Sequence, residues 1–216
     1  MYVTPDARTA VDEVVARTRR WYDTETAAFV ERTAGYERFP GLSEEILRFV
    51  ESIVDGSGPV LDLGCGAGRD TGFLLDHRRE VVAGDISATM LRTTADRYGR
   101  SRPRCVQFDM RRLPFATRSF AGAWVCASLI HIPESALGDC LAELYRTLRR
   151  RAVVAISMKA GTGCGWQSAD RDQGQRWLTL VRPESFLASM AAQGFVDLST
   201  TWSGRGSWFI AHGRTP

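Results

Sequence analysis

Lysine, signal-peptide features and membrane-spanning hydrophobic runs are scarce or missing in this sequence. Lys159 is the only lysine among the 28 basic residues; the others are arginine, a composition typical of a GC-rich genome rather than of selection for phosphate binding. The apolar run over residues 121–130 is far shorter than the roughly 18 residues that span a bilayer. The N-terminal segment contains Asp6 and no hydrophobic region, which argues against a signal peptide. We therefore expect no membrane segment and a cytoplasmic location.

Cysteine spacing and net charge exclude further classes of protein. The five cysteines, at positions 65, 105, 126, 140 and 164, are odd in number and form no C-x-x-C pair. Neither a disulfide framework nor a zinc cluster is therefore indicated, and we expect no metal site. The formal net charge of +3 is too small to indicate nucleic-acid binding by itself.

Hydrophobic periodicity predicts one α/β domain. The 216 residues are 44% hydrophobic and 25% charged, close to an ordinary globular mixture. After two helices, short apolar strands alternate with amphipathic helices, which is typical of a parallel, doubly wound sheet whose ligands bind beyond the carboxyl ends of the strands. The predicted helices cover 6–35, 43–54, 70–77, 87–98 and 183–193, with another beginning near Pro133; the predicted strands cover 60–64, 80–85, 105–109, 121–127, 152–158, 196–201 and 207–212; and 161–182 is predicted as a glycine-rich, aromatic loop.

The turn after the first predicted strand carries three glycines at alternate positions. Gly64, Gly66 and Gly68 allow a sharp turn and leave no Cβ between the backbone and a ligand. The turn opens a helix whose free N–H groups favour an anion or a carboxylate. The dinucleotide fingerprint G-x-G-x-x-G fails, because its sixth position is Arg69 or Thr71 in the two possible registers. A Walker lysine is absent as well, so phosphate-cradling interpretations are disfavoured.

Four segments, in this order, resemble the motifs of class I S-adenosylmethionine-dependent methyltransferases. The segment 62–68, DLGCGAG, resembles the first motif, and 81–87, VVAGDIS, resembles the second. Residues 107–120 resemble the third motif and 123–131 the fourth. The close resemblance covers residues 58–159. It implies a Rossmann-like, mostly parallel seven-stranded sheet with helices on both faces and an N-terminal helical lid.

The resemblance also implies how one domain, residues 1–216, binds S-adenosylmethionine. We expect N-terminal helices and a lid over 1–55, a cofactor-binding core over 58–159, and an acceptor-side loop, helix and closing strands over 160–216. The residues implied to bind the cofactor are Asp62, Gly64, Cys65, Gly66, Gly68, Arg69, Asp85, Ile86, Met90, Asp109, Met110, Ala127 and Ser128.

Several of these residues have ordinary structural interpretations beside the functional one. Asp85 ends a strand where a carboxylate accepts both ribose hydroxyls, or it is a solvated strand-end acid. Asp109 accepts from the adenine amino group while the Met110 N–H donates to the ring, or Asp109 caps a turn. Ile86 and Met90 sandwich the adenine, or Met90 belongs to the core.

The remaining residues concern the methionine end of the cofactor. Asp62 lies inside an apolar run and needs a partner, which the resemblance implies is the cofactor's amino group, reached directly or through water. Arg69 reaches the methionine carboxylate, and the neighbouring Asp70 suits a helix N-terminus electrostatically. Ala127 and Ser128 line the methionine and methyl region.

Catalysis by such a site depends mainly on alignment and exclusion of water. Tyr22 and His131 are the expected catalytic residues. His131 would deprotonate a hydroxyl or ammonium acceptor around its ordinary pKa of about 6.5, or it caps the following helix. The segment 21–23, WYD, resembles an aromatic and acidic lid, or it packs on the sheet. The aromatic loop either encloses the acceptor or packs on itself through Trp166, Gln167 and Trp177.

The sequence therefore predicts methyl transfer from S-adenosylmethionine to an O, N or C nucleophile of a small metabolite, by a monomer or homodimer. One alternative is a tRNA- or RNA-modifying methyltransferase, mildly favoured by the arginines at 100–104 and 149–151, although no RNA-binding domain is recognisable. Another is a non-catalytic protein that binds S-adenosylmethionine, because intact motifs indicate binding and not turnover.

Overall fold

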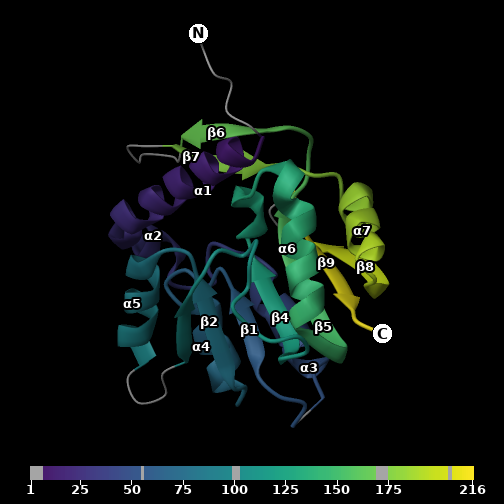
Figure 1. Ribbon diagram of the computed structural model, residues 1–216. Coiled ribbons are helices and arrows are strands. Elements are labelled where there is room, and N and C mark those ends of the chain that lie inside the picture. The colour runs from purple at the N-terminus through teal and green to yellow at the C-terminus, as the bar shows by residue number, and fades with distance from the viewer. Residues whose placement is uncertain (1–6, 55, 99–102, 169–174, 204–205) are drawn as a thin grey trace.

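The computed structural model describes residues 7–54, 56–98, 103–168, 175–203 and 206–216, and its centre is a seven-stranded sheet (Figure 1). The strand order is β3-β2-β1-β4-β5-β9-β8. All neighbouring pairs are parallel except β5–β9 and β9–β8, so the predicted doubly wound, mostly parallel sheet is confirmed. The strands are β1 (Val60–Leu63), β2 (Val81–Asp85), β3 (Arg104–Gln107), β4 (Phe120–Cys126), β5 (Leu148–Lys159), β8 (Val196–Trp202) and β9 (Trp208–Arg214).

Helices cover both faces of the sheet. On one face α3 and α4 pack around a core that includes Ile46 and Leu74, and on the other α6 and α7 pack around a core that includes Leu144 and Phe186. The predicted cap of α5 is confirmed, because the Ser87 side-chain oxygen accepts from the Met90 N–H at 3.1 Å. The helices are α3 (Leu42–Glu51), α4 (Arg69–Asp76), α5 (Ala88–Tyr98), α6 (Glu134–Thr147) and α7 (Pro183–Ala192), with the short 3₁₀ helix η2 (Leu129–His131) before α6.

Most predicted bounds differ from the structure by up to three residues, and two predictions were wrong by more than that. The N-terminal helical region is divided at Glu25 into α1 (Ala7–Thr24) and α2 (Thr26–Thr33). Strand β5 begins at Leu148 and not at residue 152, because the preceding arginines continue the strand through an irregularity at Arg151, whose φ is 58°. Among the described residues, no helix combines the length and apolarity that crossing a membrane requires.

Within the predicted loop over 161–182, the described residues form two paired strands, a β-hairpin; residues 169–174 lie outside the described residues. Strands β6 (Cys164–Ser168) and β7 (Gln175–Thr179) pair antiparallel, with Trp166 opposite Trp177. The two indole rings pack edge to face with their centroids 5.5 Å apart. Cross-strand aromatic pairs of this kind stabilise hairpins, and the glycines around them concealed the strand pattern in the sequence.

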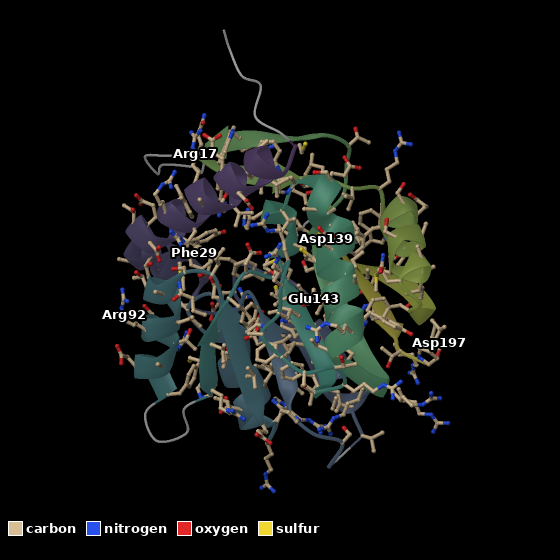
Figure 2. The ribbon with its side chains drawn as sticks, in the orientation of Figure 1. Arg17, Phe29, Arg92, Asp139, Glu143 and Asp197 are labelled. Carbon is tan, nitrogen blue, oxygen red and sulfur yellow. The ribbon has the colours of Figure 1, made fainter. Side chains whose placement is uncertain are left out.

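Helix α1 and the hairpin together lie across the carboxyl ends of the central strands (Figure 1). The two segments are in direct contact, because Arg17 of α1 donates to Gln175 Oε1 at 3.0 Å and lies 4.0 Å above the ring of Trp166 (Figure 2). Asp23, near the end of α1, accepts from the Ser87 hydroxyl at 2.6 Å and so joins α1 to the start of α5. Together with α2, helix α1 and the β6–β7 hairpin form a cover over the edge of the sheet where ligands bind (Figure 1).

The core at the centre of the sheet predicts a clear difference between two identical substitutions. Val154→Ala, at a β5 position that is 2% exposed, removes two buried methyl groups and leaves a cavity. We expect it to lower the free energy of unfolding by about 2–3 kcal/mol. Val54→Ala, at a position 75% exposed, is the matched control and should change it by less than about 0.5 kcal/mol. Urea denaturation measures both, and equal losses would contradict this account of the core.

Candidate active site

A cavity of about 480 Å³ lies at the carboxyl ends of the parallel strands, beneath the cover, of which α1, α2 and β7 supply lining residues. Its walls come from those three elements, from the segment 34–42 that follows α2, from the glycine turn after β1, and from the ends of β2, β4 and β5, with further lining residues from α4, α5, η2 and β9. Strand β1 lies between β2 and β4, so the turn that follows it stands where the direction of the strand order reverses. Both the position and the volume are typical of a small-molecule site.

The glycine turn lines this cavity, and it requires glycine for two separate reasons. Gly64 has a φ of 75°, and a Cβ there would lie only 2.2 Å from Cβ of Ser128. Gly66 has a φ of 54° and faces the ring of Phe29 in α2 across ordinary contact distance. Gly64, Cys65 and Gly66 all line the cavity, as the sequence predicts for a ligand-binding turn.

Gly68 does not line the cavity, and its predicted contact with the cofactor is not supported. A Cβ on Gly68 would lie 2.8 Å from a methyl group of Thr94 and 3.0 Å from the ring of Tyr98, both in α5. The Tyr98 hydroxyl donates a hydrogen bond to the Gly68 carbonyl oxygen. The third glycine therefore serves the packing of the turn against α5.

Asp85, at the end of β2, joins the glycine turn to the next helix. Its Oδ2 accepts from the Gly66 N–H at 2.9 Å, and its Oδ1 accepts from the Ser87 N–H at 2.8 Å. Burial raises the pKa of this carboxyl group, while the backbone donors act in the opposite direction. Each oxygen still has a lone pair for a further hydrogen bond, and Asp85 lines the cavity, so it can accept from two ligand hydroxyl groups.

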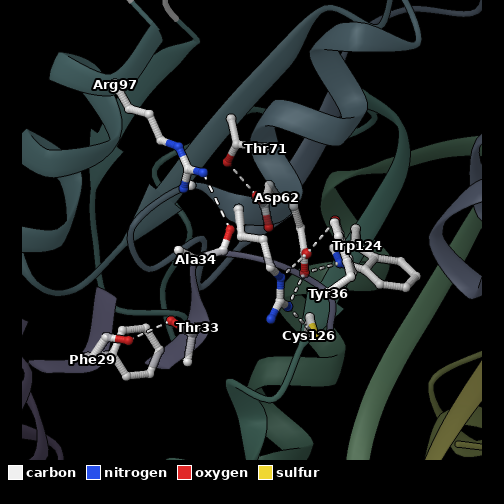
Figure 3. A network of polar contacts seen from close by, with 12 residues as sticks. Phe29, Thr33, Ala34, Tyr36, Asp62, Thr71, Arg97, Trp124 and Cys126 are labelled. Atoms are coloured by element: carbon white, nitrogen blue, oxygen red, sulfur yellow. Dashed lines mark hydrogen bonds and ion pairs between the residues drawn. The ribbon is translucent and has the colours of Figure 1, made fainter. Parts of the chain in front are cut away.

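Asp62 is buried behind the glycine turn at 2% exposure. Its Oδ2 accepts from the Thr71 hydroxyl at 2.5 Å (Figure 3). Burial, with Asp70 nearby as the next cause, raises the pKa of Asp62 to about 8. The group lines the cavity and is largely protonated at neutral pH, so a cation bound beside it would favour release of its proton.

Arg69 and Asp70 form a buried ion pair that the sequence predicted only as two separate roles. Arg69 donates to both carboxylate oxygens of Asp70, at 2.7 and 3.0 Å. Asp70 also accepts from the Tyr36 hydroxyl at 2.8 Å and from the Trp124 ring N–H at 2.9 Å (Figure 3). The guanidinium lies 4.4 Å from the centre of the Phe39 ring. Arg69 therefore reaches the cavity with its charge already balanced by Asp70, which weakens its predicted attraction for a carboxylate.

Asp109 forms an ion pair with Arg111, which was not predicted from the sequence. The side chain of Arg111 donates to both of its oxygens, at 2.6 to 3.0 Å, and also to Asp12 of α1 at 2.7 Å. The Arg111 N–H donates to Oδ1 as well, so the turn-capping interpretation holds. Asp109 and Met110 line the cavity, and their contact with adenine stays a prediction.

The other predicted cofactor contacts fall into two groups. Ile86, Ala127 and Ser128 line the cavity, and Ala127 has the uncommon φ of 52°. Met90 is completely buried and does not line the cavity. It therefore belongs to the core, and the structure gives no support to its predicted contact with the adenine. Met90 is inaccessible because it lies on the inner side of α5, one turn after the Ser87 cap.

Tyr22 and His131 meet in the cavity although 109 residues separate them. Nδ1 of His131 lies 2.7 Å from the Trp177 carbonyl oxygen, which can only accept, so Nδ1 carries the proton. Nε2 therefore accepts from the Tyr22 hydroxyl at 2.7 Å, and Arg176 donates to the same hydroxyl oxygen at 3.3 Å. The result is a chain of hydrogen bonds from Arg176 through Tyr22 and His131 to the β7 backbone.

This arrangement corrects the expectation that His131 titrates near neutrality. Burial, and then the charge of Arg176, lower the pKa of His131 to about 3. Burial also raises the pKa of Tyr22. His131 is therefore neutral at physiological pH, with both ring nitrogens engaged. It holds Tyr22 in place and is a poor general base, since its protonated form is unstable here.

The aromatic segment contributes to the cavity through different residues from those predicted. Trp166, Gln167 and Trp177 are not lining residues, because the two indoles pack on each other within the hairpin. Arg176 and Leu178, their neighbours in β7, line the cavity instead, with Lys159 and Trp208 from the ends of β5 and β9. Strand alternation was the missing signal: once 175–179 is a strand, residues 176 and 178 share one face.

Comparisons with known proteins identify relatives of this chain. Residues 60–151 match the family model described as "Methyltransferase domain". The chain is 30% identical over 133 residues to malonyl-[acyl-carrier protein] O-methyltransferase of Salmonella typhimurium, covering 61% of the chain and 51% of the relative. It is 31% identical over 109 residues to methyltransferase GfsG of Streptomyces halstedii, covering 48% of the chain and 38% of the relative. The chain spans about half the length or less of the curated relatives it matches.

Solved structures share the fold along the whole chain. The 1,6-didemethyltoxoflavin-N1-methyltransferase of Burkholderia thailandensis, solved with its substrate and S-adenosylhomocysteine, aligns with a TM-score of 0.70 at 22% identity, covering 99% of this chain and 93% of that one. The [4+2]-cyclase SpnF aligns with a TM-score of 0.69 at 17% identity, covering 99% and 98%. At such identities the likeness shows the fold alone, and one fold carries differently named activities.

The buried state of His131 predicts a pH-dependent loss of stability. Below pH 6.5 the unfolded chain binds a proton at this histidine, whereas the folded chain does not until its pKa of about 3, so stability falls as the pH drops through this window. The loss due to His131 should reach about 2 kcal/mol at pH 5. Urea unfolding at pH 7 and pH 5 measures it.

Two glutamine variants isolate this effect from the other titrating groups. His131→Gln should lose less stability than the wild type between pH 7 and pH 5, by about 2 kcal/mol. His77→Gln, at an exposed position in the turn after α4, should keep the wild-type dependence. Identical pH dependence in all three proteins would show that His131 is accessible to protons in the folded state.

Proposed function

We propose that this chain, which carries a methyltransferase domain of the class I S-adenosylmethionine-dependent family, transfers a methyl group from S-adenosylmethionine to a small molecule. The observation that carries the proposal is the cavity at the carboxyl edge of the sheet, where the glycine turn, Asp85 and Asp62 lie together. S-adenosylmethionine, when bound, supplies a methyl group made electrophilic by a positively charged sulfur. The residues of the chain then have to bind the cofactor and the acceptor, orient them toward each other, and exclude water.

The residues present fit such a cofactor. Asp85 keeps free lone pairs for the two ribose hydroxyl groups, with its other lone pairs held by Gly66 and Ser87. Asp62 would hold the positively charged amino group, directly or through water, and the cation would favour its ionised form. The backbone of Gly64 and Gly66 leaves space beside the cavity where side chains would intrude.

The acceptor would occupy the other end of the cavity, beyond Ala127 and Ser128. Tyr22 is positioned there by His131, and we propose that the pair orients the acceptor by hydrogen bonding. Related proteins named above act on malonyl-[acyl-carrier protein] and on 1,6-didemethyltoxoflavin, which supports a small or carrier-linked acceptor here. We further propose that the protein is a monomer or homodimer, that it does not bind nucleic acid, and that it is cytoplasmic. The free state of all five cysteines supports a reducing location.

Calorimetric titration with S-adenosylhomocysteine tests the cofactor assignment. Asp85→Asn removes the charge that strengthens two hydrogen bonds to the ribose, so binding should weaken about a hundredfold. Asp139→Asn, at an exposed position on α6 (Figure 2), makes the same chemical change away from the cavity and should leave the affinity unchanged. NADH should not bind. An unchanged dissociation constant in Asp85→Asn would mean that the ribose is held elsewhere, and NADH binding alone would overturn the proposed function.

Helices α1 and α2 should respond to the cofactor as a lid. Tyr22 and Phe29 reach the cavity from this segment, and Asp23 ties it to α5 beside Asp85. A bound ligand adds contacts to these side chains, so hydrogen exchange over residues 7–33 should slow when S-adenosylhomocysteine is added. Peptides from α7, which packs against β8 and β9 and contributes no residue to the cavity lining, are the internal control. Equal exchange with and without ligand would make the two helices a permanent part of the fold.

A further inference from the structure

The carboxylates that line the cavity are confined to one end of it, whereas lining cations occur throughout: besides Lys159 and Arg176, they are Arg32, Arg38, Arg69 and Arg97. The lining carboxylates are Asp62, Asp70, Asp85 and Asp109, and all four stand on β1, α4, β2 or the turn after β3. The other end is built from α1, η2, β5, β7 and β9. Its described lining residues include no carboxylate, whereas they include two cations, Lys159 and Arg176. The end that contains the four carboxylates therefore carries charges of both signs, whereas the lining of the other end carries positive charge only and is suited to an anion.

Arg176 reaches the cavity from β7 with part of its hydrogen-bonding capacity unused. Its guanidinium lies 5.0 Å from the centre of the Trp21 ring and donates one bond, to the Tyr22 hydroxyl. Within the part of the chain that the structure describes, it forms no ion pair with a carboxylate. A half-buried guanidinium has five N–H donors, and leaving its charge unmatched costs free energy.

Lys159 adds a second positive charge to the same end. It is the last residue of β5, it is half-buried, and it lines the cavity beside β9. No carboxylate among the described residues pairs with it. The contrast with Arg69 is informative: that arginine also lines the cavity, but Asp70 neutralises it.

The remaining polar groups at this end supply hydrogen bonds and no strong base. His131 is held by Tyr22 and by the Trp177 carbonyl oxygen, and the hydroxyl proton of Tyr22 points to His131. A neutral alcohol entering here would find no group suited to take its proton. A carboxylate, which is already ionised, needs none: a bond would form between its oxygen and the methyl carbon as the bond from that carbon to sulfur breaks, with S-adenosylhomocysteine as the leaving group. Both cations attract such an acceptor.

We propose that the methyl acceptor is an organic acid whose carboxylate binds at this end of the cavity, facing Arg176 beside Tyr22 and attracted by Lys159. Arg176 is the group with directional donors, since a guanidinium matches the geometry of a carboxylate. Lys159 acts through its charge within the enclosed cavity. The proposal rests on the proposed function, because it assigns the other end of the cavity to S-adenosylmethionine.

Matched acids and amides test the proposal on protein saturated with S-adenosylhomocysteine. The probes are phenylacetate and phenylacetamide, and octanoate and octanamide, titrated by calorimetry up to 10 millimolar, on the order of the weak affinities expected of fragments. Because Lys159 is the only lysine, protein labelled with ¹³C-lysine gives one lysine side-chain signal in an NMR spectrum, which places any bound acid. We expect at least one acid to bind about tenfold or more tightly than its amide and to shift the Lys159 signal.

Variants of the two cations show which of them causes the preference for an acid over its amide. Arg176→Gln should abolish the preference for the acid, and Lys159→Gln should reduce it severalfold. Arg20→Gln, at an exposed position on α1, changes the net charge equally and should keep the preference. Equal binding of every acid and its amide, no binding of any acid, or an undiminished preference in Arg176→Gln would each overturn the proposal.

Failure of this proposal can be told from failure of the proposed function. Binding of S-adenosylhomocysteine is measured first on each protein, and a variant that misfolds loses it. If the cofactor product binds and the acids show no preference, only the acceptor assignment is wrong. If the cofactor product does not bind at all, the proposed function itself is wrong, and the acceptor assignment fails with it.

Discussion

The carboxylate of Asp85 connects the parts on which the cavity depends. It accepts one hydrogen bond from the glycine turn and one from the start of α5, so the ends of β1 and β2 and two helices are held in one arrangement. The turn itself can form only because Gly64 allows Ser128 to approach within contact of its backbone. The ligand-facing surface is therefore shaped by backbone geometry and by one buried acid, and side chains from the cover add to it.

The cover is the part of the molecule that differs most from a bare doubly wound sheet. Arg17 joins α1 to the β6–β7 hairpin, and α1, α2 and β7 place Tyr22, Phe29 and Arg176 over the cavity. The chain of hydrogen bonds from Arg176 to the Trp177 carbonyl passes through residues of α1, η2 and β7. Any movement of the N-terminal helices would therefore change the acceptor end of the cavity, and it would also move Phe29 away from Gly66 and break the hydrogen bond from Ser87 to Asp23 at the cofactor end.

The division of charge within the cavity links the fold to the chemistry. The lining carboxylates stand on β1, α4, β2 and the turn after β3, whereas the two cations at the acceptor end, Lys159 and Arg176, come from the last parallel strand and from β7. Neighbours with this fold include an N-methyltransferase and a cyclase, so the sheet alone does not select a reaction. Selection of the acceptor belongs to the cover and to the residues it brings together.

Much of the fold was accessible from the sequence, because strand and helix periodicities and glycine turns are local features. The strands from 60 to 126, the cap at Ser87 and the ligand-facing turn at Gly64 and Gly66 were predicted from such patterns and are present. Tertiary structure decided what depends on residues distant in the chain. It moved Gly68 and Met90 into packing roles, balanced Arg69 with Asp70 and Asp109 with Arg111, and replaced the predicted loop with a hairpin. It also lowered the pKa of His131, because burial by segments far along the chain, rather than the residue type, sets the stability of its charged form.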